Sequence, residues 1–91
     1  MVRAKFRVDT IELSIHHNYE KQEDGSPKLV PVEKRTIVMH PVSANNDPNH
    51  ENSKFWAASP TGELKLGTIN PEAWKQFEIG KEYYLDFTSA D

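Results

Sequence analysis

Three cations and one indole are the residues of this chain best suited to bind a small anion that carries an aromatic ring. Arg7, Arg35 and Lys54 can neutralise one or two phosphates, and Trp56 can stack on a base. Stacking of this kind contributes about 1–3 kcal/mol per base. The competing interpretation is that the three cations are solvated surface charges and that Trp56 belongs to the core.

The four histidines do not form a pattern that predicts a metal site. His16 and His17 are adjacent, so on a strand they point to opposite faces. His50 with Asp47 or Glu51 lacks the spacing of a known metal site, and the chain has no cysteine. We therefore expect no metal and no cofactor.

Patterns typical of catalysis are also missing from the sequence. It contains no Gly-x-Ser-x-Gly elbow, no phosphate-binding Gly-x-x-x-x-Gly-Lys-Ser/Thr loop and no Gly-x-Gly-x-x-Gly fingerprint. Paired carboxylates such as Glu23 and Asp24 lie in a predicted loop, where solvation leaves carboxylates with ordinary acidity. We expect no catalytic residues and a protein that is not an enzyme.

The length and charge of the chain limit the classes of protein that it can represent. Ninety-one residues form one small domain, which we expect to span residues 1–91. No apolar run approaches the roughly 20 residues of a membrane span. The net charge of −3 makes extensive duplex nucleic-acid binding unlikely, because each phosphate contact needs a cation.

Two long strands are predicted in the first half of the chain. Apolar residues occupy even-numbered positions over residues 2–8 and odd-numbered positions over residues 11–15. This change indicates a β-bulge near Asp9 and Thr10. A second strand is expected over residues 29–42, after an exposed loop over residues 18–28. Antiparallel pairing would place Ala4 opposite Val42, Phe6 opposite His40, Val8 opposite Val38 and Glu12 opposite Lys34, with Arg3, Lys5 and Arg7 on the other face.

The second half is predicted to contain a hairpin, a helix and a final strand. After an exposed polar loop over residues 43–53, residues 54–58 and 63–69 flank a Ser-Pro-Thr-Gly turn. Asn70-Pro71 is typical of a helix start, which predicts one short helix near residues 71–77. The fold class is therefore all-β (small α+β): a five-stranded antiparallel barrel, SH3-like or OB-like.

Two aromatic residues are candidates for a subunit interface. Phe55 and Trp56 would point to opposite faces of a strand, which leaves one large ring exposed. Tyr84 would lie outside with Asp86, while Tyr83, Leu85 and Phe87 point inward. Because exposed apolar patches on small domains often mark association, Trp56 and Tyr84 predict a homo-oligomer.

The stretch over residues 54–88 resembles a family of small uncharacterised proteins of tailed bacteriophages. The resemblance lies in Phe55-Trp56, in Ser59-Pro-Thr-Gly-Glu-Leu, in Ile69-Asn-Pro-Glu-Ala and in the run from Phe77 to Thr88. It implies a phage origin and a setting in the host cytoplasm, and it implies no activity or catalytic residue.

These observations favour a non-enzymatic binding protein. The leading hypothesis is a phage-encoded homo-oligomer that sequesters an anionic nucleotide-type ligand, such as a host immune signal, and so acts against host defence. The alternative is a virion or assembly component that acts through protein contacts, and a third is a weak binder of single-stranded nucleic acid. A ligand binder needs cations and a ring in one pocket, whereas an assembly protein needs a continuous apolar surface.

Overall fold

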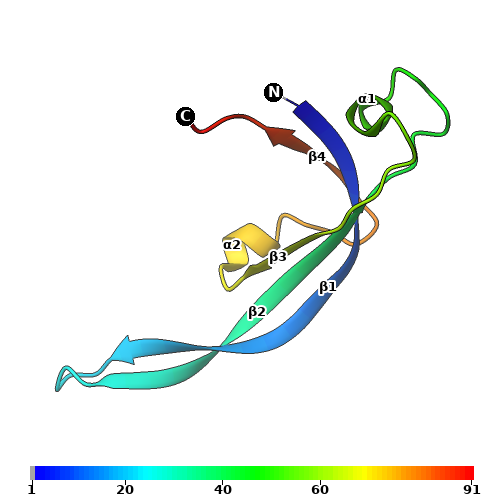
Figure 1. The fold of residues 1–91 in the computed structure, drawn as a ribbon. Coiled ribbons are helices and arrows are strands. Elements are labelled where there is room, and N and C mark those ends of the chain that lie inside the picture. The colour runs from blue at the N-terminus through cyan, green and yellow to red at the C-terminus, as the bar shows by residue number, and fades with distance from the viewer. Residues whose placement is uncertain (1) are drawn as a thin grey trace.

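An open sheet of four antiparallel strands forms the molecule, with two short helices beside it (Figure 1). The computed structural model describes residues 2–91. The order across the sheet is β3-β2-β1-β4. The chain is therefore mostly β with little helix, as predicted. The elements are β1 (Val2–Lys21), β2 (Pro27–Pro41), α1 (Glu51–Trp56), β3 (Leu64–Thr68), α2 (Pro71–Trp74) and β4 (Glu82–Phe87).

The predicted five-stranded barrel, SH3-like or OB-like, is wrong. Residues 51–56 form a helix, although residues 54–58 were predicted as a strand. Closure of a barrel also requires its edge strands to pair. Over residues 2–91, β3 pairs only with β2 and β4 pairs only with β1, so the sheet stays open.

The bulge in β1 is confirmed at the predicted place. Pairing between β1 and β2 shifts between Val8 and Thr10, so Asp9 is the extra residue. The bulge explains why the apolar positions of β1 change from even to odd numbers, because one unpaired residue reverses the alternation of side chains.

The register predicted for β1 and β2 is wrong by one residue before the bulge and by two after it. A shift by one residue exchanges the two faces of a strand. Odd-numbered residues of β2 therefore face the core, and His40 lies on the opposite face. The observed pairs are Phe6 with Pro41, Val8 with Met39, Glu12 with Thr36 and Ser14 with Lys34.

The core lies where β1 and β2 are flanked by the other strands. Five buried residues form it, two of them from β2. Partly buried side chains from the second half of the chain cover them, among them Trp74 and, as expected, Tyr83 and Leu85. The buried residues are Ala4, Phe6, Val8, Ile37 and Met39.

The β1–β2 hairpin extends far beyond this core (Figure 1). β4 pairs with residues 2–7 of β1, and β3 pairs with residues 35–39 of β2. From Ser14 and Lys34 outward the ribbon has only two strands. We call residues 13–35 the arm; it accounts for the elongated shape of 62 × 33 × 19 Å.

The tip of the arm is a tight turn and not the long loop predicted over residues 18–28. β1 continues to Lys21 and β2 begins at Pro27. Most side chains of residues 18–28 are nevertheless exposed, as predicted. The Asp24 carboxylate accepts hydrogen bonds from the backbone N–H and hydroxyl of Ser26, which lower the pKa of Asp24. Gly25 adopts a left-handed conformation with φ of 86°, which favours glycine.

Both helices are short and begin at side chains that cap them. Asn70 accepts a hydrogen bond from the N–H of Glu72, which confirms the predicted start of α2, and α2 ends at Trp74. α1 was not predicted. The His50 ring caps it by accepting from the N–H of Asn52, and the left-handed Ala57 ends it. Within residues 2–91, neither helix is long and apolar enough to cross a membrane.

Candidate functional site

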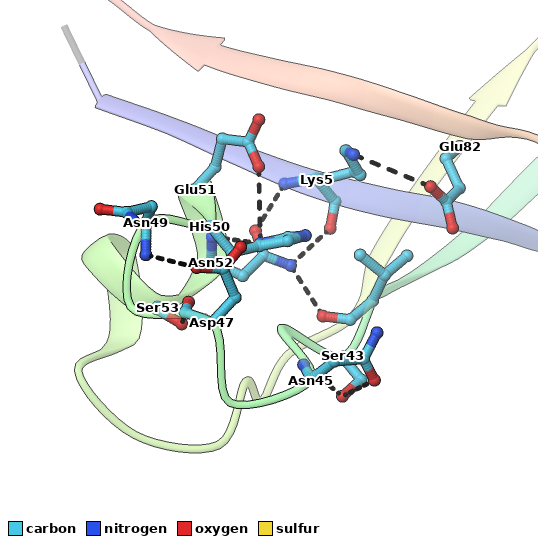
Figure 2. A network of polar contacts seen from close by, with 11 residues as sticks. Lys5, Ser43, Asn45, Asp47, Asn49, His50, Glu51, Asn52, Ser53 and Glu82 are labelled. Atoms are coloured by element: carbon cyan, nitrogen blue, oxygen red, sulfur yellow. Dashed lines mark hydrogen bonds and ion pairs between the residues drawn. The ribbon is translucent and has the colours of Figure 1, made fainter.

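One buried amide fixes α1 to the sheet and so positions Lys54, Phe55 and Trp56. The side chain of Asn52 is fully buried. Its Nδ2 donates to the carbonyls of Lys5 (2.9 Å) and Val42 (2.8 Å), and its Oδ1 accepts from the Lys5 N–H at 2.7 Å (Figure 2). The amide thus pairs with β1 as a neighbouring peptide group would.

Trp56 packs into the side of the core. Its ring centroid lies 6.2 Å from that of Phe6 and 4.5 Å from that of Phe55, and its Nε1 donates to the carbonyl of Thr61 at 2.9 Å. Trp56 is half-buried, whereas Phe55 is 44% exposed. The more exposed of these two rings is therefore that of Phe55.

Lys54 and Phe55 line an open hollow between α1 and the start of β1. The hollow has a volume of about 330 Å³, and Val2, Arg3 and Glu51 complete its lining. Neither Arg7 nor Arg35 lines it. Lys54 thus shares the hollow with Arg3, a cation of β1 that the sequence analysis did not select for a ligand site.

The cations of β1 lie on the outer face of the sheet, as predicted, and β4 places two carboxylates beside them. Arg3 forms two hydrogen bonds to Asp86, at 2.6 and 3.1 Å, and this contact lowers the pKa of Asp86. Lys5 and Arg7 each lie 3.9 Å from a carboxylate oxygen of Glu82. The pairing of β1 with β4 therefore places an acidic strand beside a basic one.

Tyr84 lies among these charges. It is 51% exposed, on the outer side of β4 as predicted. The guanidinium of Arg3 lies 4.5 Å from the centre of its ring, and the ammonium of Lys5 lies 5.2 Å from it. A cation over an aromatic face is attracted by the ring quadrupole. The interface predicted for Tyr84 and Trp56 stays a prediction.

Arg35 lies on the core side of the sheet, at the base of the arm. Its guanidinium lies 4.4 Å from the centre of the Trp74 ring and 3.3 Å from the Glu33 carboxylate. Arg7 lies on the opposite face. The structure therefore places Lys54 and Trp56 on the same helix, but only Lys54 lines the hollow, and Arg7 and Arg35 lie elsewhere.

His40 joins the bulge to the segment before β3, a contact that the sequence analysis missed. Its Nδ1 lies 2.5 Å from Asp9 and its Nε2 lies 2.9 Å from Glu63. Hydrogen bonds to these two carboxylates raise the pKa of His40, because only the protonated ring donates from both nitrogens. The carboxylates contact opposite ring nitrogens. Over residues 2–91 no group of three or more histidine, cysteine, aspartate or glutamate side chains is arranged to hold a metal ion.

The arm carries an exposed apolar strip that the sequence analysis also missed. In register, Leu13 lies opposite Arg35, Ile15 opposite Glu33, His17 opposite Pro31 and Tyr19 opposite Leu29, so all eight side chains share one face. We call this set the arm face. Its large apolar side chains are between 52% and 74% exposed. The apolar residues at positions 11, 13, 15 and 19 were the available signal.

Comparison with known proteins found no match. No protein-family model, no curated protein and no solved structure matches the chain.

Proposed function

We propose that the chain is a non-catalytic binding protein that acts through protein–protein contact, and that the arm face is its contact surface. One observation carries the proposal: Ile15, Tyr19 and Leu29 lie exposed on one face of a ribbon that has only two strands, and Leu13 continues this face at its base. An isolated two-stranded ribbon is marginally stable in water. A protein packed on this face would bury the apolar strip and support the ribbon.

The charge of the arm favours a protein over a nucleic acid as the partner. Residues 13–35 contain four carboxylates and four cations, which gives a net charge of zero. A surface that binds a phosphate backbone needs a clear excess of cations. The proposed role is therefore that of an assembly component that works by contact.

The phage origin and the setting in the host cytoplasm belong to this proposal. Both rest on the resemblance of residues 54–88 to small bacteriophage proteins. An assembly or virion component would fit such a source, since a contact surface needs no catalytic group.

A photoreactive residue on the arm tests the proposed function. We expect benzoylphenylalanine at position 19, on the arm face, to form a covalent adduct with a protein in the native host cell. The same residue at position 18, on the other face of the same strand, is the matched control and should form little adduct. No adduct at position 19, or equal adducts at both positions, would contradict the proposal.

The hollow beside α1 supports a second candidate function, the capture of an anionic nucleotide-type ligand. Its volume of about 330 Å³ lies at the lower end of the range usual for small-ligand sites, about 300–1,000 Å³. Lys54 could hold a phosphate there beside Arg3, whose guanidinium also pairs with Asp86, and the exposed Phe55 ring could stack on a base.

Calorimetric titration with cyclic dinucleotides and ADP-ribose tests this second candidate. We expect binding with a Kd below about 100 μM, or about −5.5 kcal/mol. Lys54→Ala should weaken it, whereas Lys75→Ala, a lysine beside α2, should not. Binding that both variants leave unchanged would place the ligand elsewhere.

A further inference from the structure

We propose that the arm face packs against the arm face of a second copy of this chain, with the two arms antiparallel about a two-fold axis near His17. This inference rests on the proposed function, because both assign protein contact to the arm. It adds the identity of the partner and the geometry of the contact.

The accessible surface of the chain is the first argument. A compact monomer of 10.4 kDa exposes about 5,400 Å². This chain exposes 6720 Å², an excess of about 1,300 Å². Each partner in a stable dimer of standard size buries about 800 Å². The excess is therefore sufficient for one dimer interface.

The pattern of the arm face is the second argument. A two-fold axis brings the same surface of both copies together, so a self-complementary strip is required. Apolar residues stand near both ends of the strip, with Leu13 at the base and Tyr19 and Leu29 toward the tip. Antiparallel arms would place the tip of each copy on the base of the other, and apolar side chains would meet apolar side chains.

The position of α2 decides between antiparallel and parallel arms. Trp74 of α2 lies on the same face as the arm face, in contact with Arg35 at its base. In a parallel arrangement the two copies of α2 would meet and hold the arms apart. In an antiparallel arrangement the two copies of α2 lie at opposite ends of the contact, so they do not meet.

The adjacent histidines supply a matched test of this geometry. His17 lies on the arm face, near the proposed axis, and His16 lies on the opposite face. The chain contains no cysteine, so each single substitution introduces a unique thiol. Facing sheets pack about 10 Å apart, beyond the roughly 7 Å reach of a disulfide, so a short bis-maleimide linker is the suitable probe.

We expect the purified His17→Cys variant to give a covalent dimer with this linker and the His16→Cys variant to give at least tenfold less. Both side chains are exposed, so circular dichroism should show the same fold for both variants. No linked dimer at position 17, or equal linking at both positions, would overturn the inference. An adduct of position 19 with a different protein in cells would then leave the proposed function standing with another partner.

Discussion

Asn52 shows how one residue can determine the position of a whole helix. Its amide satisfies both backbone groups of Lys5 and the carbonyl of Val42. The sequence places it in a run of polar residues between positions 43 and 53, and nothing in that run separates a buried asparagine from its exposed neighbours. Its role depends on contacts with residues 10 and 47 positions away in the chain.

We expect Asn52→Ala to lower the free energy of unfolding by about 3 kcal/mol. The substitution removes three hydrogen bonds and leaves the Lys5 N–H and the Val42 carbonyl without the Asn52 amide, whereas the Lys5 carbonyl still accepts from the Val42 N–H. Urea denaturation measures the loss. Asn49→Ala is the control, because Asn49 is exposed, and it should change stability by less than about 0.5 kcal/mol. Equal effects would contradict the anchoring role.

His40 predicts how stability depends on pH. Its pKa in the folded protein lies above the ordinary value of 6.5, so the folded state binds the proton more tightly than the unfolded state. The contribution is complete below pH 6.5 and is lost as pH rises through the pKa of the folded protein. Glu63 has a lowered pKa, so its contribution is present above pH 4.5 and is lost on acidification.

Thermal unfolding from pH 5 to pH 9 measures this dependence. We expect Tm to fall as pH rises above 6.5, and His40→Gln to remove most of that fall. His16→Gln should retain it, because His16 lies on the arm, away from Asp9 and Glu63. A fall of the same size in the His40→Gln protein would show that another group is responsible.

At the scale of elements, the alternation of apolar residues and the capping residues predicted those features that depend only on residues near in sequence. The reversed phase of β1 located the bulge at Asp9, and Asn70-Pro71 located the start of α2. Residues 54–58 were predicted as a strand because they precede the Ser-Pro-Thr-Gly turn of an expected hairpin. The His50 cap and the Asn52 anchor instead hold this segment as α1, and only the tertiary fold shows the second of these.

The length of the two arm strands was underestimated for a related reason. Residues 18–21 carry no apolar alternation except Tyr19, since no core lies beside them, and the sequence pattern therefore predicted a loop. The four candidate ligand residues were selected by side-chain chemistry alone. The observed strand register puts Arg35 on the face opposite to Arg7, and the other two, Lys54 and Trp56, lie on α1.

Hydrogen exchange should separate the arm from the base of the sheet. If contact with a second copy supports the arm, backbone amides of residues 14–21 and 27–34 should be protected at 100 μM protein and should lose protection on dilution below the Kd of the dimer. Amides of Phe6 and Ile37, in the core, should remain protected at both concentrations. Arm protection that does not change with concentration would contradict this expectation.

The whole molecule is extended for a chain of this length. Its radius of gyration is 17.9 Å, whereas a compact domain of 91 residues has a value of about 12 Å. The core is small, and much of the chain lies in a ribbon that has no third strand within the described residues. This shape is typical of a protein that completes its packing by association.

The molar mass of the purified protein in solution tests the central claim most directly. Light scattering at 100 μM should give twice the chain mass of 10.4 kDa. The double variant Leu13→Ser, Tyr19→Ser should give the mass of one chain, while Ser14→Ala, Asn18→Ala, altered on the other face, should remain a dimer. A mass of one chain for the unaltered protein, or a dimer that the arm-face variant leaves intact, would contradict the account.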